Sequence, residues 1–253
     1  MLSAKRSRLI LYYFSIRIYR EQEAEYYRTI KELCPAIVKF IPEFYGVCSI
    51  EYNGSTQDYL RIQDFTKDYE YPCIVDLKIG TVTWDESASE EKRQKQDKKY
   101  PLQRVLGFRF TGIRIFNNDT NKYDVYDKAY GYSLNESTIS NGFQSFFRDV
   151  DPADLPLVID SVLAQLSELL SVFRESHLRY RCSSVLITYE GSSKRQSSLS
   201  NASSTLLKYG AAVHLIDFAH VRQLAPDQLD QGCITGLERI ILELGRLKES
   251  LST

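Results

Sequence analysis

The sequence is poor in the residues on which metal and redox sites are usually built. Its 253 residues include three histidines, one methionine and one tryptophan. The five cysteines are odd in number and lack the spacing of metal ligands: Cys34, Cys48, Cys73, Cys182 and Cys233. We therefore expect buried, reduced thiols, and a protein of the cytoplasm or the nucleus.

The chain also lacks a net charge of either sign and a long apolar run. Charged residues make up 26% of the sequence, yet the formal net charge is -1. A near-neutral chain has no broad field for nucleic acid or for a membrane surface, so a polyanion site must be a local patch. No segment has the length of apolar run that spans a bilayer. We expect no nucleic-acid partner and no insertion into a membrane.

The usual phosphate-binding sequences are missing as well. The chain has no GxxxxGK[ST] loop, no other Gly-rich phosphate loop, and no HRD or DFG sequence. A nucleotide site in this protein must therefore be built from other residues.

The run PCIVDLKIG at residues 72–80 predicts the buried strand around which the chain is organised. Side chains alternate along a strand, so Asp76 and Lys78 point to one face and the aliphatic residues point to the other. Two interpretations of this pair stay open. It is either an ion pair within the strand, which is the more common case, or a site for a polyanion and its metal.

The first 65 residues predict a small β-rich lobe. Residues 8–18 favour a strand, and residues 19–33 have the composition of a helix that ends before a proline. Asn53-Gly54 is a hairpin signal between strands at residues 47–52 and 59–65. We expect residues 66–253 to form a second, larger lobe.

Residues 86–99 predict a helix that is polar on all sides. Ser87 or Ser89 can cap its start, and its acidic residues come early and its lysines late, as the helix dipole prefers. One face collects four residues at helical spacing: Lys92, Lys95, Gln96 and Lys99. This face is either a solvated charge run or a site for a polar ligand.

The rest of the chain mixes helices and strands, so the predicted fold class is α+β. A hairpin is expected at residues 109–116 and 122–127, further strands at 183–189 and 212–218, and helices at 133–147, 154–173 and 234–247. Two predicted strands thus deliver an aspartate each, Asp76 and Asp217. Phosphoryl transfer needs a carboxylate for Mg²⁺, cations for the phosphates and a positioned hydroxyl. The residues alone make a nucleotide-dependent kinase plausible.

Three motifs resemble those of the inositol polyphosphate kinases, the family of the inositol trisphosphate 3-kinases, inositol polyphosphate multikinases and inositol hexakisphosphate kinases. Residues 72–80 resemble its PxxxDxKxG signature, residues 183–191 (SSVLITYEG) its SSLL…YEG strand, and residues 215–220 (LIDFAH) its IDFAH motif. The motifs come in the family's order, and the resemblance runs from about residue 17 to the C-terminus.

The resemblance implies a two-lobed, protein-kinase-like fold with ATP in the cleft between the lobes. It implies that Asp76 binds the ribose, that Lys78 lies beside the transferred phosphoryl group, and that Asp217 binds Mg²⁺. Lys78 and Asp217 are the implied catalytic residues, and ATP and Mg²⁺ are the expected cofactors. The other implied ATP contacts are the hinge residues Gln63, Asp64 and Phe65, together with Ser184 and Arg17, which stands where the family has a lysine.

The resemblance also implies the substrate, a soluble inositol polyphosphate. Its implied ligands are Lys78, Lys92, Lys95, Gln96, Lys99, Lys128 and His220. A structural role stays open for Ser184 and His220, and an exposed strand position stays open for Arg17.

Positions 95 and 128 carry lysine where the multikinases have glutamine, which favours inositol hexakisphosphate as an acceptor and a diphosphate as the product. The alternatives are a kinase of inositol 1,4,5-trisphosphate and a non-catalytic inositol-phosphate-binding module. We expect a monomer.

Overall fold

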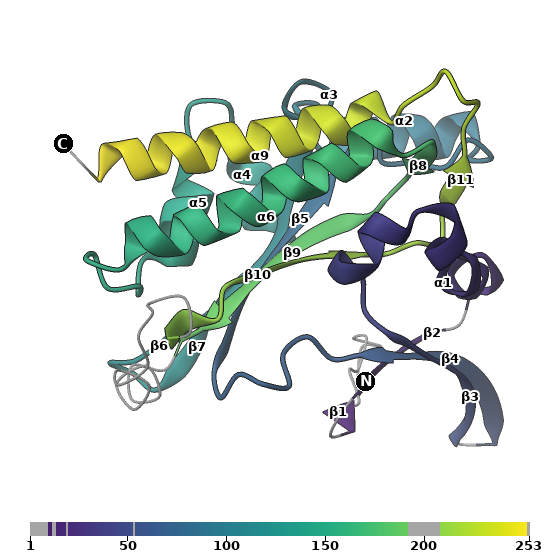
Figure 1. Ribbon diagram of the computed structural model, residues 1–253, viewed down its shortest axis with the longest axis horizontal. Coiled ribbons are helices and arrows are strands. Elements are labelled where there is room, and N and C mark those ends of the chain that lie inside the picture. The colour runs from purple at the N-terminus through teal and green to yellow at the C-terminus, as the bar shows by residue number, and fades with distance from the viewer. Residues whose placement is uncertain (1–9, 12–13, 19, 53, 192–207, 252–253) are drawn as a thin grey trace.

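A four-stranded and a five-stranded β-sheet form the framework of the molecule (Figure 1). The structure is a computed structural model and describes residues 10–11, 14–18, 20–52, 54–191 and 208–251. The smaller sheet has the order β1-β2-β4-β3, with β1 (Ile10–Leu11), β2 (Phe14–Ile18), β3 (Phe44–Tyr52) and β4 (Ser55–Gln63). The predicted hairpin is confirmed by the pairing of β3 with β4. The described part of residues 8–18 forms two short paired strands rather than one.

The helix that follows β2 packs against the larger part of the molecule. α1 (Glu21–Leu33) lies where the sequence predicts a helix, and a 3₁₀ helix, η1 (Pro35–Phe40), follows it. Tyr26 of α1 stacks on Phe218 with ring centroids 4.2 Å apart, and its hydroxyl lies 3.3 Å from that of Tyr180. Glu23 is buried beside them and accepts a hydrogen bond from Phe218 N. α1 therefore joins the smaller sheet to the segment that follows Asp217.

β5 (Pro72–Ile79) is the central strand of the larger sheet, as the sequence predicts. The strand order is β10-β9-β5-β6-β7, and every neighbouring pair is antiparallel. The other strands are β6 (Phe108–Asn117), β7 (Lys122–Tyr126), β9 (Ser184–Glu190) and β10 (Ala212–Ile216), and a separate ribbon pairs β8 (Leu178–Tyr180) with β11 (Val221–Gln223). Buried and half-buried residues alternate along β5. This alternation confirms that Asp76 and Lys78 share the face opposite the aliphatic residues.

Helices cover the aliphatic face of the larger sheet. α5 (Ile139–Phe147), α6 (Leu155–Glu175) and α9 (Gln231–Ser250) lie on that side, with α6 and α9 next to each other (Figure 1). The helices predicted at residues 154–173 and 234–247 are thus confirmed.

The helix predicted at residues 133–147 is confirmed over Ile139–Phe147 (α5) but wrong at its start, because residues 134–138 form a loop between α4 (Lys128–Ser133) and α5. In this loop Asn135 Oδ1 accepts hydrogen bonds from Ser137 N and Ser137 Oγ, which offers the backbone an alternative to the helix. Two further short helices, α2 (Glu90–Lys99) and α3 (Gln103–Leu106), lie between β5 and β6 in the sequence.

Within the described residues, α6 alone is long and apolar enough to cross a membrane. By this measure the expectation that no segment reaches that length was wrong. Val162 and Leu166 of α6 are buried against the rest of the molecule, as in the core helix of a globular protein, so its composition is weak evidence for a membrane span.

All five cysteines are free thiols, as expected. Cys73 and Cys233 are buried, but Cys34, Cys48 and Cys182 are only half-buried, so the expected burial was wrong for these three.

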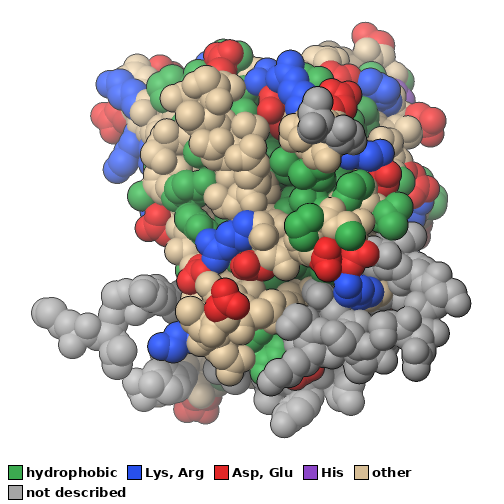
Figure 2. All heavy atoms as spheres, turned by 90° about the vertical axis from the view of Figure 1, so that its left-hand side faces the viewer, with side chains coloured by type: hydrophobic (Ala, Val, Ile, Leu, Met, Phe, Trp, Pro, Cys, Tyr) green, Lys and Arg blue, Asp and Glu red, His purple; other side chains and the backbone are tan. Residues whose placement is uncertain are grey.

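Charges of both signs are interspersed on the surface. On the side of the molecule that faces away from α2, Lys and Arg side chains stand among Asp and Glu (Figure 2). Surface charges of opposite sign also form ion pairs between α6 and α9. Arg174 lies 2.7 Å from Glu238, and Lys248 lies 2.6 Å from Asp160. The face in Figure 2 therefore offers no broad basic surface, which agrees with the near-zero net charge.

Gly236 and Gly245 of α9 form a matched pair for testing how closely this helix packs. A Cβ at Gly236 would lie 2.2 Å from Gly107 O, whereas a Cβ at Gly245 would meet nothing within 4 Å. We expect Gly236→Ala to lower the free energy of unfolding by roughly 1–3 kcal/mol, because the backbone cannot yield. Gly245→Ala should raise it by roughly 0.5–1 kcal/mol through helix propensity. Urea denaturation measures both values, and equal effects would contradict the close approach of α9 to Gly107.

Candidate functional site

Lys78 is held between two groups that come from neighbouring strands. Its Nζ donates a 2.6 Å hydrogen bond to Cys182 O and lies 3.9 Å from Asp217 Oδ2. The side chains of Lys78 and Asp217 are 19% and 26% exposed, so both are partly desolvated but accessible. The structure thus brings the two predicted catalytic residues together. The carboxylate partner of Lys78 is Asp217 rather than Asp76, so the simple ion pair within the strand is not formed.

The two partners of Lys78 have unusual backbone conformations. Asp217 has a φ of 71° and Cys182 a φ of 62°, which is the left-handed region that residues with a Cβ rarely adopt. Ser183 Oγ donates a 2.7 Å hydrogen bond to Asp217 O and ties the two turns together. Such strain persists only where surrounding contacts impose it, and it is concentrated at functional sites.

The polar face of the larger sheet carries buried atoms that lack a partner. Among the described residues, Asp76 Oδ1, Ser184 Oγ and His214 Nδ1 are buried without a hydrogen bond. The strand register places Ser184 opposite Lys78, and it places Leu186 between Asp76 and His214. Buried polar atoms are nearly always paired, so three unpaired atoms on one face indicate the position of a polar ligand.

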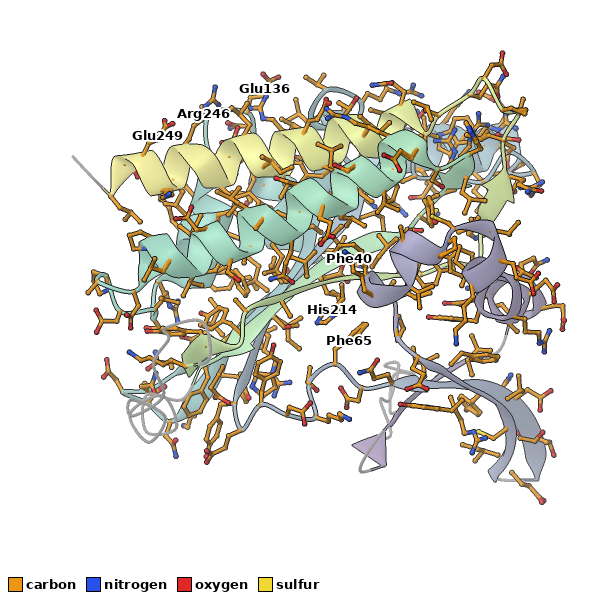
Figure 3. The ribbon with its side chains drawn as sticks, viewed as in Figure 1. Phe40, Phe65, Glu136, His214, Arg246 and Glu249 are labelled. Atoms are coloured by element: carbon orange, nitrogen blue, oxygen red, sulfur yellow. The ribbon has the colours of Figure 1, made fainter. Side chains whose placement is uncertain are left out.

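The predicted hinge, residues 63–65, runs beside these atoms. Phe65 stacks on His214 with ring centroids 3.5 Å apart, on the side of the sheet away from α6 (Figure 3). Gln63 Oε1 accepts a 3.2 Å hydrogen bond from a backbone amide just before β3, and Asp64 Oδ1 accepts one of 2.8 Å from Thr66 N. The side chains of Gln63 and Asp64 therefore stabilise the backbone of the segment between β4 and β5. Phe65 packs this segment against the larger sheet.

Polar contacts hold α2 in place, because none of its residues is buried. Ser89 caps its start by accepting a 3.3 Å hydrogen bond from Lys92 N, which confirms one of the two predicted caps. Trp84 Nε1 donates a 3.0 Å hydrogen bond to Asp97 Oδ1, and the Arg93 guanidinium lies 4.7 Å from the centroid of the Trp84 ring. These contacts fix one side of α2 and leave its lysines exposed.

Four cations gather around the C-terminal end of α2. Although Lys99 is exposed, partial desolvation lowers its pKa, and the nearby charges of Arg109, Lys95 and Lys128 lower it further. Lys99 Nζ also donates a 3.1 Å hydrogen bond to Gln96 Oε1. The structure therefore brings three predicted ligands on α2 close to Lys128 at the start of α4. Cations held this close repel one another, so the cluster favours an anion.

Arg109 is a residue of this cluster that the sequence analysis missed. It is 6% exposed and lies opposite Lys78 in the pairing of β5 with β6. Its Nη1 donates a 2.6 Å hydrogen bond to Gln103 Oε1, and Gln103 Nε2 donates another of 2.6 Å to the backbone carbonyl that follows β5. Burial lowers the pKa of Arg109. The sequence did contain a signal: Arg109 stands between Phe108 and Phe110 in a predicted strand. A charged residue in such an apolar strand is rarely buried unless it has a polar partner.

His220 lies in a pocket near the N-terminal end of α2. The pocket has a volume of about 430 Å³ and is lined by three segments: the start of α1, residues 85–87 and residues 219–222. Burial lowers the pKa of His220, the carboxylate of Asp85 opposes this effect, and the charges of Arg20 and Lys92 add to it. Lys92 and His220, both predicted substrate ligands, are therefore close together. Asp85 and Arg20 are further residues that the sequence analysis did not find.

The structure says little about two predicted features, the phosphate contact at Arg17 and the Mg²⁺ site at Asp217. Arg17 lies in β2 opposite Leu60, and its side chain falls outside the described part of the structure. Within the described residues, no group of three or more His, Cys, Asp or Glu side chains is placed to hold a metal ion. Mg²⁺ keeps several waters and takes phosphate oxygens beside one or two carboxylates, so Asp217 fits such a site only together with a nucleotide.

The imidazole of His214 provides a test of whether the polar face of the larger sheet excludes solvent. Burial lowers the pKa of His214 to about 4, so its imidazole is neutral near pH 7. An unfolded histidine takes up its proton near pH 6.5. Between about pH 6.5 and pH 4 the unfolded state therefore binds more protons, and stability falls as the pH falls.

Because of His214, we expect the free energy of unfolding to fall by roughly 2 kcal/mol when the pH is lowered from 7 to 5. His214→Phe, which keeps a ring against Phe65, should remove this part of the pH dependence. Urea denaturation of both proteins at the two pH values measures it. The same pH dependence in both would contradict the burial of a neutral imidazole.

Comparisons with known proteins agree with the motifs and with this geometry. The family model described as inositol polyphosphate kinase matches residues 59–244. The inositol polyphosphate multikinase of Homo sapiens is 34% identical over 160 residues, which are 62% of this chain and 37% of that protein. The inositol hexakisphosphate kinase 3 of Mus musculus is 30% identical over 215 residues, which are 80% of this chain and 54% of that protein. The chain thus spans well under two thirds of the length of these relatives.

A solved structure has the same fold. The crystal structure of the inositol phosphate multikinase of S. cerevisiae, in complex with ADP and Mn²⁺, superposes with a TM-score of 0.80 and 24% identity, covering 93% of this chain and 99% of that chain. This likeness confirms the predicted α+β, kinase-like architecture. Since the family model also matches more than half of the sequence, the chain belongs to the inositol polyphosphate kinase family.

Proposed function

We propose that the protein is an ATP- and Mg²⁺-dependent kinase that phosphorylates a soluble inositol polyphosphate. The observation that carries the proposal is the position of Lys78, 3.9 Å from Asp217 Oδ2 and paired across the sheet with the buried Arg109. An ammonium, a carboxylate and an adjoining cluster of cations are the parts that phosphoryl transfer needs.

The nucleotide would lie on the polar face of the larger sheet, next to the hinge. The unpaired Asp76 Oδ1 suits a ribose hydroxyl, which donates a hydrogen bond, and the unpaired Ser184 Oγ suits a phosphate oxygen. The S. cerevisiae multikinase was crystallised with ADP and Mn²⁺, which supports a nucleotide and a divalent metal in this chain. Asp217 would hold Mg²⁺, whose charge offsets the charge that develops on the phosphates. Arg17 stays the proposed phosphate contact from the smaller sheet.

Lys78 is suited to the transferred phosphoryl group. An ammonium carries three N–H donors, and one of them is bound to Cys182 O. The other two N–H donors can bind phosphoryl oxygens, and the Asp217 carboxylate lies close to the same position. Because the ammonium is partly desolvated, its attraction to a developing negative charge is stronger than in water.

The acceptor would bind along α2. Its phosphates would meet the cation cluster around Lys99 at one end of the helix, and Lys92 with His220 at the other. Gln96 supplies a neutral hydrogen-bonding group within this row. Each well-formed contact between a phosphate and a cation contributes roughly 1.5–3 kcal/mol.

Within this class we propose inositol hexakisphosphate as an acceptor, with a diphosphate as the product. Lys99 and three other cations form this cluster. A trisphosphate would leave some of the four unpaired, whereas a hexakisphosphate can pair with all of them. A relative named inositol hexakisphosphate kinase aligns over 80% of this chain, which supports the assignment. Relatives named multikinases support the alternative, inositol 1,4,5-trisphosphate. Exposed lysines discriminate poorly by shape, so both acceptors can be used.

Three substitutions separate the proposed roles in catalysis. Asp217→Asn should abolish turnover, because an amide is a poor Mg²⁺ ligand. Lys78→Ala should lower kcat by roughly 100-fold or more, because it removes a cation from the transition state. Asp76→Asn should mainly raise the KM for ATP, because a ribose contact is shared by the ground and transition states.

Steady-state kinetics with varied ATP measures all three substitutions, and the exposed Lys122→Ala is the control. A folded Asp217→Asn protein with near-normal kcat would contradict the metal site, and a Lys78→Ala effect on the KM for ATP alone would contradict the assignment of Lys78.

Product analysis by anion exchange tests the substrate. The protein is incubated with ATP, Mg²⁺ and either inositol hexakisphosphate or inositol 1,4,5-trisphosphate. We expect a diphosphate from the hexakisphosphate, and we expect Lys95→Gln and Lys128→Gln to raise its KM by roughly tenfold each. Lys122→Gln, at an exposed position of β7, should have little effect.

Turnover of the trisphosphate alone, with no competition by the hexakisphosphate, would establish the alternative substrate. Binding of both compounds without turnover would identify a non-catalytic binding protein.

A further inference from the structure

Asp85 is a buried carboxylate that none of the proposed catalytic or substrate contacts uses. Asp85 is 6% exposed, and it lies just before the turn that precedes α2. Asp85 Oδ1 accepts hydrogen bonds from Ser87 Oγ and, at 2.9 Å, from Ser87 N. The hydrogen bond from Ser87 Oγ is the largest cause that lowers the pKa of Asp85 to about 2. A buried carboxylate that stays ionised must be paired with donors or cations.

Two of its partners come from a distant part of the chain. Arg222 Nη2 lies 3.3 Å from each carboxylate oxygen of Asp85, and His220 Nδ1 lies 3.4 Å from Oδ2. Both side chains line the pocket of about 430 Å³ that also contains Arg20 from the start of α1. Asp85 therefore links the turn before α2 to the segment that follows Asp217, and it is one of the residues that line this pocket.

The contact determines which nitrogen of His220 is available. When Nδ1–H faces a carboxylate, the tautomer and the ring orientation are fixed and Nε2 is left for another partner. The charged groups that act on His220 are Asp85, which favours the imidazolium, and Arg20 and Lys92, which oppose it. Arg222 shares the same carboxylate. Removing Asp85 would leave the ring among cations alone.

We propose that Asp85 is a positioning residue of the acceptor site: it accepts from Nδ1–H of His220 and pairs with Arg222, so that the protonated ring can donate from Nε2–H, and the guanidinium can pair, with a phosphate group of the inositol phosphate. The inference rests on the proposed function for the identity of the ligand. The relation between Asp85 and His220 does not depend on that identity.

Asp85→Asn tests this role, because the amide keeps the shape of the side chain and removes its charge. The matched control is Asp151→Asn, since Asp151 Oδ1 accepts a 2.9 Å hydrogen bond from Ala153 N, the same turn geometry far from the pocket. The first measurement is the NMR titration of the imidazoles in the ligand-free protein, with the His220 signal assigned from His220→Gln.

We expect the titration midpoint of His220 to fall by about half a pH unit or more in Asp85→Asn, because the neutral amide no longer favours the imidazolium. The midpoint of His214 should not change, and Asp151→Asn should leave the midpoint of His220 in place. An unchanged midpoint for His220 in a folded Asp85→Asn protein would overturn the proposal.

The second measurement is the affinity for inositol hexakisphosphate by calorimetry, together with the KM values for both substrates. Asp85→Asn should weaken hexakisphosphate binding by roughly tenfold and change the KM for ATP less than twofold. The loss should be smaller at high pH, where the imidazole is neutral with or without the Asp85 carboxylate. Equal losses for ATP and the inositol phosphate would show that Asp85 only supports the fold, and would overturn the proposal.

A double substitution completes the test. If Asp85 acts through its partners, Asp85→Asn combined with His220→Gln should weaken binding less than the sum of the two single effects. Arg222→Gln, at a side chain that is 56% exposed, provides a second variant if Asp85→Asn does not fold, and it too should weaken hexakisphosphate binding. Full affinity in Arg222→Gln would overturn the proposal. If the wild-type protein binds the hexakisphosphate without phosphorylating it, the proposed kinase function fails while the titration and binding results still decide the role of Asp85.

Discussion

The ammonium of Lys78 is the group on which the arrangement of the site depends. It connects Cys182 O, just before β9, with the carboxylate of Asp217, just after β10. These two residues are neighbours because β9 and β10 are antiparallel and Ser184 pairs with Ile216. A partly buried ammonium needs such partners, since burial without them is costly. In return, the contact helps to hold two left-handed backbone conformations that the chain would not adopt by itself.

The alternation of side chains along β5 ties this site to the hydrophobic core. Val75, Leu77 and Ile79 are fully buried on the side that the helices cover, and Asp76 and Lys78 lie between them in the sequence. A shift of β5 by one residue would exchange the two faces, burying the charges under α6 and α9. The packing of the core therefore fixes the register that presents Asp76 and Lys78 to the ligand face. The unpaired atoms on that face are the cost of leaving it open to a ligand.

Local patterns in the sequence were enough to predict most strands of the two larger sheets and the polar helix, which begins at Glu90 rather than at residue 86. Contacts between distant segments, such as the pairing of β8 with β11, could not be predicted from them. The alternation in residues 72–80 and the Ser89 cap depend on neighbours within a few residues, and both are found in the structure. Arg109 looked like an ordinary strand residue, because its role depends on which strand lies beside β5. Asp85 stood next to the helix predicted at residues 86–99 and gave no signal of its role, because the segment containing His220 and Arg222 is far away in the sequence. The break at Asn135 was missed because a side-chain turn competes with helix formation.

The cations of the proposed acceptor site share one physical requirement: each needs a support that does not occupy its ligand-facing side. Gln103 supports Arg109 through a hydrogen bond, and Asp85 supports His220 and Arg222 through ion pairs. α2 itself buries none of its residues and is fixed mainly by its cap and by Trp84. An element with so few buried contacts has little stability of its own, and the repulsion among its lysines lowers it further. A polyanion that binds only the folded arrangement adds its binding free energy to that stability. If α2 binds the acceptor as proposed, the ligand therefore also stabilises the helix that recognises it.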